Sequence, residues 1–312
     1  MNITKKQTQQ ICKKLGKKLV NFSFLGKGDH NLNYLIKTKN KKYVLRIRNV
    51  HFKSLKKEYF FLKSTNGKFG PKVYLFDDSK KIIPKVFLVE EFLEGKHPSK
   101  KATDKFVIAM AKWFRRLHDI KTLKKPDCAR KGYYSLSCAV KPYYNNYVKY
   151  KYRADNKLPK ELYSYFEKAI ELCEINDKAF IGRKRFSILN MDPSRGNVFC
   201  KKDKIKLIDW EFYMCGVPEW DIIYFFDSYK LESYHKKLFF KTYNYPSSRI
   251  AQKRIQMLSL VQICAEIGYL LLRLDIIYKN KQASKKNKKD ILERINKRIT
   301  PFKKLIEKVK EM

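Results

Sequence analysis

The segment Asn190–Phe212 places three oxygen-bearing side chains around what reads as a short β-hairpin. Asp192 lies five residues before Asn197, and Asp209 lies twelve residues after it. The residues between Asn197 and Asp209, VFCKKDKIKLI, read as two short strands joined by a polar turn. Because a hairpin returns the chain to the end where it started, we expect Asp192, Asn197 and Asp209 to lie close together.

This set of oxygen atoms suits phosphoryl transfer from ATP. In-line transfer needs a carboxylate that orients the acceptor hydroxyl, and oxygen ligands for the metal ion that neutralises the phosphates. Asp192 would serve the first purpose, and Asn197 and Asp209 the second. The alternative is that Asp192 and Asn197 are ordinary turn residues beside Pro193 and Gly196.

The part of the chain before residue 93 has strand patterns. Residues 4–19 read as a short basic helix, and residues 21–49 as three strands separated by a Gly-containing loop and a turn. A helix carrying Glu58 should follow, and then two more strands in GPKVYLFD and KVFLVEEF. The third strand alternates, with Tyr43, Leu45 and Ile47 on one face and Val44, Arg46 and Arg48 on the other.

The remainder of the chain is mostly helical in pattern. The segment TDKFVIAMAKWFRRLHDI has one apolar face, PKELYSYFEKAIELCEI reads as another helix, and residues 119–158 read as irregular. We therefore predict an α+β fold of two lobes. The smaller N-lobe, residues 1–92, is an antiparallel sheet with a helix, and the larger C-lobe, residues 93–312, is mainly helical and carries the catalytic loop and the acceptor site.

The net charge of +41 has two explanations. A basic surface could bind RNA or another polyanion. Alternatively, drift in a genome rich in A and T would enrich Lys, Asn, Ile, Phe and Tyr, and this chain is rich in all of them. Clustered lysines would favour the first explanation, and residues 1–28 contain no acid while residues 279–290 form a basic run.

Cysteine spacing and hydropathy bear on the compartment. The seven cysteines are scattered and no pair is spaced C-x-x-C, which argues against a disulfide framework or a zinc site and favours a reducing, cytoplasmic location. The most apolar segment, residues 257–278, is interrupted by Glu266, Arg273 and Asp275. We therefore expect a buried helix there and no transmembrane segment.

Several motifs together resemble a known family. NMDPSRGN, LIDWEF and VPEWDIIYFF are similar, in this order, to the catalytic motifs of the aminoglycoside phosphotransferase and choline kinase superfamily. LGKGDHNLNYLI, YVLRI, KKEYFFL, VEEFLEG and FRRLH resemble its other conserved segments, so the resemblance spans about residues 20–230. It implies a two-lobed protein-kinase-like fold that uses ATP and Mg²⁺.

The resemblance also implies roles for the matching residues. Asp192 would be the catalytic base, and Asn197 and Asp209 would bind Mg²⁺. Arg46 would contact the ATP phosphates and pair with Glu58.

Further positions would complete the nucleotide site. Gly26 and Gly28 would let the backbone approach a phosphate, and the segment from Glu90 to Phe92 would lie against the adenine through backbone groups. Asn190 departs from the pattern, because the family usually has His there. Asp221 matches a structural Asp of the family, and we expect His118 to be a buried, hydrogen-bonded residue at a helix end.

Three functions remain open from these residues. The first is transfer of the γ-phosphate of ATP to a hydroxyl of a small molecule of the choline, ethanolamine, thiamine, sugar or aminoglycoside type. The second is an RNA kinase that phosphorylates a ribose hydroxyl of a structured RNA such as tRNA. The third is a pseudokinase that binds without catalysis.

Overall fold

The computed structural model describes residues 3–28, 30–49, 55–120, 122, 125–130, 133–154, 157–181, 186–279 and 285–311. The chain forms two compact units. Unit 1 comprises Met1–Leu117, Asn190–Tyr213 and Ser228–Phe239, and unit 2 comprises His118–Leu189, Met214–Asp227 and Phe240–Met312. The lobe boundary after residue 92 stays a prediction. Residues 280–284 of the predicted basic run lie outside the described residues.

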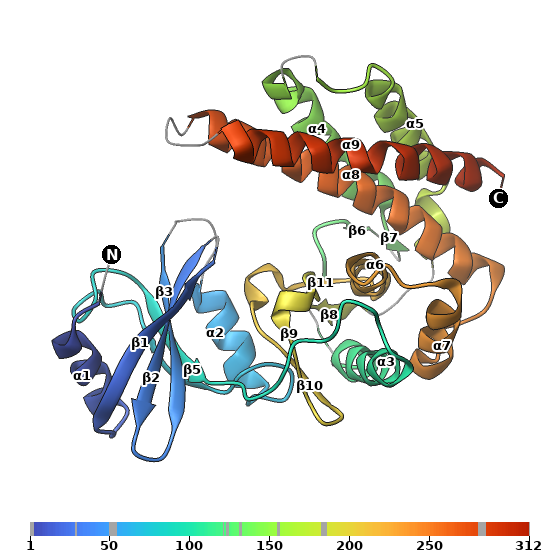
Figure 1. Ribbon diagram of the computed structural model, residues 1–312. Coiled ribbons are helices and arrows are strands. Elements are labelled where there is room, and N and C mark those ends of the chain that lie inside the picture. Colours follow the sequence, from blue (N-terminus) through green and yellow to red (C-terminus); the bar gives the residue numbers. More distant parts are fainter. Residues whose placement is uncertain are drawn as a thin grey trace. The chain divides into compact units, whose positions relative to one another are not determined.

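Unit 1 is built on a five-stranded sheet (Figure 1). Its strands are β1 (Leu19–Lys27), β2 (Asn31–Thr38), β3 (Lys42–Arg48), β4 (Val73–Asp77) and β5 (Phe87–Glu91). They lie in the order β1-β2-β3-β5-β4, and every neighbouring pair is antiparallel. The α+β class and the antiparallel N-terminal sheet that the sequence predicted are therefore confirmed.

The two faces of this sheet have different partners. Helix α1 (Lys5–Lys14) begins with a capping box in which Thr4 and Gln7 exchange hydrogen bonds. Its Ile11 shares one apolar core with Leu45 of β3. The side chain of Arg46 alternates to the opposite face and meets Glu58 of helix α2 (Leu55–Ser64). The alternation in β3 thus separates an apolar core from a charged site.

The predicted hairpin forms in unit 1. Strands β9 (Val198–Lys201) and β10 (Lys204–Leu207) pair with Val198 opposite Leu207. The backbone N–H of Leu207 donates to Phe69 O at 2.9 Å. A Cβ atom at Gly70 would lie 2.7 Å from Leu207 O, so only glycine lets the chain pass here. The short helical turns η3 (Arg195–Asn197) and η4 (Trp210–Phe212) flank the hairpin.

Helices dominate the rest of the chain. They are α3 (Asp104–His118), α4 (Leu136–Tyr150), η1 (Lys151–Ala154), α5 (Leu162–Ile175), η2 (Asp177–Phe180), α6 (Glu219–Ser228), α7 (Ser233–Tyr243), α8 (Arg249–Lys279) and α9 (Lys285–Lys310). Two short strand pairs accompany them in unit 2: β6 (Ala129–Arg130) with β7 (Tyr133–Tyr134), and β8 (Ser187–Leu189) with β11 (Met214–Gly216).

The prediction that residues 119–158 are irregular is wrong for α4. Ser135 caps the helix by accepting a hydrogen bond from the N–H of Cys138 at 3.1 Å. Pro142 lies inside α4. Tyr147 is buried, and its ring stacks on Phe166 of α5 with 4.6 Å between centroids. Burial of tyrosines on one helical face, which the sequence reading missed, makes this segment part of the core of unit 2.

Helix α8 is the apolar segment singled out in the sequence. Its length and composition would allow it to cross a membrane. However, 67% of its most apolar 18-residue stretch is buried within the protein. This burial favours the interpretation of α8 as a helix of the protein core, as the sequence predicts. The aromatic residues expected in the core are also buried: Trp210, Trp220, Phe225 and Phe226.

Cys128 and Cys138 form a disulfide, with Cα atoms 5.5 Å apart, a pairing that the cysteine spacing did not predict. The cause is local, because the β6–β7 hairpin folds the chain back and the N–H of Ser135 donates to Cys128 O at 2.9 Å. The first turn of α4 then places Cys138 beside Cys128. A cytoplasmic location stays a prediction.

Candidate active site

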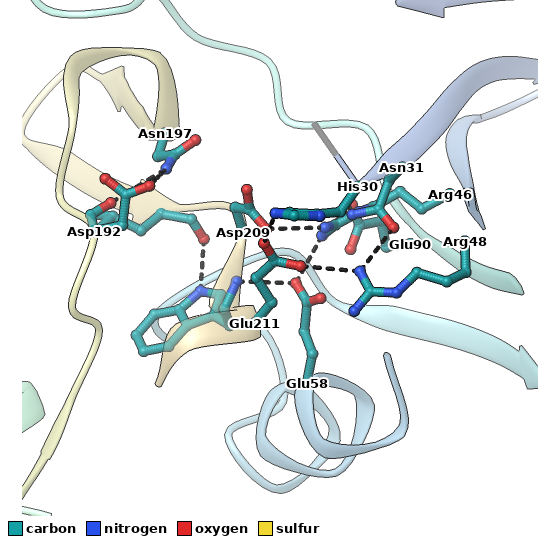
Figure 2. A network of polar contacts seen from close by, with 12 residues as sticks. His30, Asn31, Arg46, Arg48, Glu58, Glu90, Asp192, Asn197, Asp209 and Glu211 are labelled. Atoms are coloured by element: carbon teal, nitrogen blue, oxygen red, sulfur yellow. Dashed lines mark hydrogen bonds and ion pairs between the residues drawn. The ribbon is translucent and has the colours of Figure 1, made fainter. Parts of the chain in front are cut away.

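The centre of the site is a buried guanidinium surrounded by carboxylates (Figure 2). Arg46 on β3 is 5% exposed. Its Nη1 lies 2.6 Å from Glu58 Oε1 and 3.7 Å from Glu90 Oε1, and its Nη2 lies 3.2 Å from Asp209 Oδ1. The pairing of Arg46 with Glu58 is therefore present, and Glu90 joins it through its side chain, which the sequence reading did not foresee.

Local structure explains this convergence. Glu90 lies on β5, which pairs directly with β3. Glu58 lies in the first turn of α2 and also accepts a hydrogen bond from the backbone N–H of Trp210 at 3.0 Å. The Glu58 carboxylate thus bonds both Arg46 on the sheet and Trp210, the residue after Asp209. The two chain segments predicted to bind phosphate and metal are therefore held by the same side chain.

Burial and charge shift the pKa values of this cluster. Burial alone would lower the pKa of Arg46, but the carboxylates of Glu58, Glu90 and Asp209 more than offset it and raise that pKa. Burial raises the pKa of Glu58, and it raises the pKa of Glu90 to about 8. With three carboxylates around one guanidinium, burial favours a retained proton on the buried Glu58 and Glu90 carboxyls.

Glu90→Gln should change how stability depends on pH. The raised pKa of Glu90 means that its stabilising contribution is present below the unfolded value of 4.5 and is lost as pH rises through about 8. Gln does not ionise, so the free energy of unfolding of the variant should rise by about 4 kcal/mol relative to that of the wild type between pH 5 and pH 9. Urea unfolding at several pH values measures this. Glu94→Gln, an exposed acid nearby, should show no such gain, and parallel pH curves for Glu90→Gln and the wild type would contradict the assignment.

A second buried ion pair, missed in the sequence, lies beside the first. Arg48 Nη1 donates to Glu211 Oε2 at 2.9 Å and to Asn31 Oδ1 at 3.2 Å, and His30 Nε2 lies 3.5 Å from Glu211 Oε1. Arg48 follows Arg46 by two residues on a strand, and Glu211 follows Asp209 by two residues. The alternation that placed Arg46 in the site could have identified Arg48 as well.

Glu211→Gln should destabilise unit 1 moderately. Gln keeps the shape of Glu211, and Asn31 still accepts from Arg48, but the buried guanidinium loses its carboxylate. The free energy of unfolding should fall by about 2 kcal/mol, measured by urea denaturation. Glu293→Gln on the exposed face of α9 is the matched control. An equal and small loss of unfolding free energy in both variants would show that the Arg48–Glu211 pair does not contribute to stability.

The catalytic-loop residues lie together before the hairpin. Asn197 Nδ2 donates to Asp192 Oδ2 at 2.7 Å, and the N–H of Asp192 donates to Asn190 Oδ1 at 3.1 Å. Asn190 is fully buried and so fixes the backbone at Asp192, although the family usually has His there. Burial raises the pKa of Asp192; hydrogen bonds from Ser194 oppose this rise and the nearby charge of Asp209 adds to it.

Asp209 and Asn197 are the residues that could hold a metal. The N–H of Ile208 donates to Asn197 O at 2.9 Å, which places Asp209 next to Asn197 across the hairpin. The Asn197 amide nitrogen is used on Asp192, so its oxygen is the atom available to a metal. Within the described residues no group of three His, Cys, Asp or Glu side chains could hold a metal. One carboxylate and one amide oxygen fit Mg²⁺ that is also held by substrate phosphates.

The remaining predicted positions also lie in unit 1. Gly26 is in β1 and Gly28 follows it, and within the described residues a Cβ atom at Gly26 would meet nothing within 4 Å. The packing of the chain therefore does not require glycine at Gly26, and its role in phosphate approach stays a prediction. Phe92 follows β5 and lines a pocket. The adenine-binding role of Glu90 and Phe92 stays a prediction too.

His118 is structural, as expected. It ends α3, is 8% exposed, and contacts Asp221 Oδ2 through Nε2 at 3.1 Å and Tyr243 Oη through Nδ1 at 2.8 Å. Asp221 is fully buried in α6. Both residues belong to unit 2, where this buried contact has a structural role.

The chain matches the phosphotransferase enzyme family over residues 21–234, and it belongs to that family. This span includes every site residue described above. No curated protein sequence is similar enough to match the chain.

Solved structures with the same fold cover nearly the whole chain. Choline kinase LicA from Streptococcus pneumoniae is 17% identical with a TM-score of 0.65, covering 95% of this chain and 98% of that chain. Choline kinase from Cryptosporidium parvum Iowa II is 18% identical with a TM-score of 0.65, covering 93% and 90%. Spectinomycin phosphotransferase in complex with ADP and spectinomycin is 14% identical with a TM-score of 0.60, covering 97% and 98%. The protein-kinase-like fold is thereby confirmed.

Proposed function

We propose that the protein is an ATP- and Mg²⁺-dependent kinase that transfers the γ-phosphate of ATP to a hydroxyl of a small molecule. The observation that carries this proposal is the arrangement of Asp192, Asn197 and Asp209 at one end of the β9–β10 hairpin, next to the Arg46–Glu58 pair. The fold is shared with choline kinases and an aminoglycoside-type phosphotransferase. An acceptor of the choline, ethanolamine, thiamine, sugar or aminoglycoside type is therefore the first to test.

On the donor side, Arg46 would bind phosphate oxygens of ATP. Its guanidinium is held in place by Glu58, so little orientational freedom is lost when a phosphate binds. The backbone around Gly26 and Gly28 would cover the phosphates, and the segment Glu90–Phe92 would contact the base. Mg²⁺ bound by Asp209 and Asn197 would neutralise the transferred phosphoryl group.

On the acceptor side, Asp192 would orient the hydroxyl and accept its proton. The carboxylate is fixed by Asn197 and by the backbone contact to Asn190. Its pKa is raised by burial, which makes it a better proton acceptor than an exposed carboxylate.

A panel of acceptors tests the proposal. ADP formation is followed with choline, ethanolamine, thiamine, a hexose and an aminoglycoside, each with Mg²⁺ and again with EDTA. We expect one acceptor class to raise ADP formation above the rate with water, only when Mg²⁺ is present, and the product to gain one phosphate by mass spectrometry. If ATP neither binds nor reacts under any of these conditions, the proposal is wrong.

A further inference from the structure

A pocket in unit 1 lies beside Glu91, the last residue of β5, and residues 92–94, which follow it. It has a volume of about 540 Å³ and lies between the β2–β3 turn and the face of the β9–β10 hairpin that carries Phe199. Seven of its fourteen lining residues are lysines, whereas Lys and Arg together make up 71 of the 312 residues of the chain. We call it the lysine pocket.

The lysines come from two elements that are distant in sequence. Four belong to the β2–β3 turn and its flanks: Lys37, Lys39, Lys41 and Lys42. Three belong to the hairpin: Lys201, Lys204 and Lys206. In the hairpin, Lys204 pairs with Lys201, and Lys206 pairs with Phe199, so all four side chains project from one face.

Acidic groups neutralise only part of this charge. Lys206 bonds Glu91 at 2.7 Å and Lys201 bonds Glu94 at 2.8 Å, and these two glutamates are the only acids in the lining. Within the described residues, no ion pair engages Lys37, Lys39 or Lys204. The five excess positive charges around one pocket repel one another, and a bound anion would relieve this repulsion.

The lysine pocket is too far from the predicted phosphate loop to serve the ATP phosphates. Gly28 lies just before the start of β2 at Asn31, whereas the β2–β3 turn follows the end of β2 at Thr38. Seven steps along an extended strand cover about 23 Å. An anion in the lysine pocket therefore does not occupy the position proposed for the ATP phosphates beside Gly28.

The lining indicates the class of ligand. Phe92 and Phe199 line the same pocket, and Lys42 Nζ lies 5.6 Å from the centroid of the Phe92 ring. Lysines interleaved with aromatic rings in a concave site are typical of surfaces that bind single-stranded nucleic acid, since phosphates pair with the ammonium groups and bases stack on the rings. We propose that the lysine pocket binds single-stranded RNA. This proposal does not require catalysis, but it shares Phe92 with the segment proposed to contact the base of ATP, so the oligonucleotide is tested without ATP.

Fluorescence anisotropy with a labelled 12-nucleotide oligouridylate, without ATP, tests the proposal. The pocket variant Lys37→Gln/Lys39→Gln/Lys204→Gln should bind about tenfold more weakly than the wild type at low salt. The slope of log affinity against log salt should also fall by about 2, because three phosphate contacts are lost. The matched control is Lys303→Gln/Lys304→Gln/Lys308→Gln on exposed positions of α9, which removes the same charge.

The control decides between a site and a general charge effect. We expect the α9 variant to bind within about twofold of the wild type, with an unchanged salt slope. An equal loss of affinity in both variants would show that binding of the oligonucleotide depends only on net charge, and would overturn the proposal. The proposal also fails if inorganic tripolyphosphate displaces the oligonucleotide at equal phosphate concentration, or if a 12-base-pair duplex binds equally well. Circular dichroism of both variants confirms that they are folded.

Discussion

Asp192→Asn should abolish phosphotransfer and leave the fold intact. Asn has the same shape and can still accept the hydrogen bond from Asn197, but its neutral amide cannot accept the proton of the acceptor hydroxyl. We expect kcat to fall by about a thousandfold with the KM for ATP nearly unchanged, because Asp192 is proposed to contact the acceptor and not the donor. Steady-state ADP formation with the best acceptor measures both constants.

The control for this variant is Asp203→Asn. Asp203 lies in the turn of the same hairpin, and its side chain is exposed and pairs only at the surface with Lys105. Activity and unfolding free energy should both remain at the wild-type level. If Asp192→Asn retained full activity, Asp192 would be a turn residue, as the alternative reading of the sequence allows.

Arg46→Met should have the largest effect on stability. It leaves Glu58, Glu90 and Asp209 facing one another, two of them buried, without their cation. We expect the free energy of unfolding to fall by about 3–5 kcal/mol, measured by urea denaturation, and ATP binding to be lost with it. Arg46→Lys should lose less stability, because it keeps the charge but not the two-nitrogen contact with Glu58 and Asp209.

A double variant separates stability from function at this position. Arg46→Met/Glu58→Met replaces the buried pair with apolar side chains and should recover much of the lost stability. ATP binding, followed by calorimetry, should stay absent. Recovery of ATP binding together with stability would show that Arg46 has only a structural role.

Much of unit 1 could be predicted from the sequence because its signals are local. The alternation of Tyr43, Leu45 and Ile47 predicts which face of β3 is apolar, and the opposite face carries Arg46. The hairpin pattern after Asn197 predicts the return of the chain to Asp209. Both predictions depend on strand period and turn residues, which act over a few neighbouring positions.

The missed features depend on contacts between distant segments. Glu211 could be placed near Arg48 only once β3 and the end of the hairpin are adjacent in space. Helix α4 was missed because its Tyr and Lys content hides an apolar face that only packing against α5 reveals. The Cys128–Cys138 pair depends on the β6–β7 hairpin, which is only two residues long in each strand.

Transfer of the γ-phosphate of ATP at the Asp192 loop is the activity proposed for this protein. The most direct measurement is transfer of label from γ-labelled ATP with Mg²⁺ to a small-metabolite extract and to total RNA in parallel, with Asp192→Asn as the control. We predict label in a small hydroxyl compound that is absent with the variant. Label in an RNA band instead would make the protein an RNA kinase. No label in either fraction, despite measurable ATP binding, would contradict the account and indicate a pseudokinase.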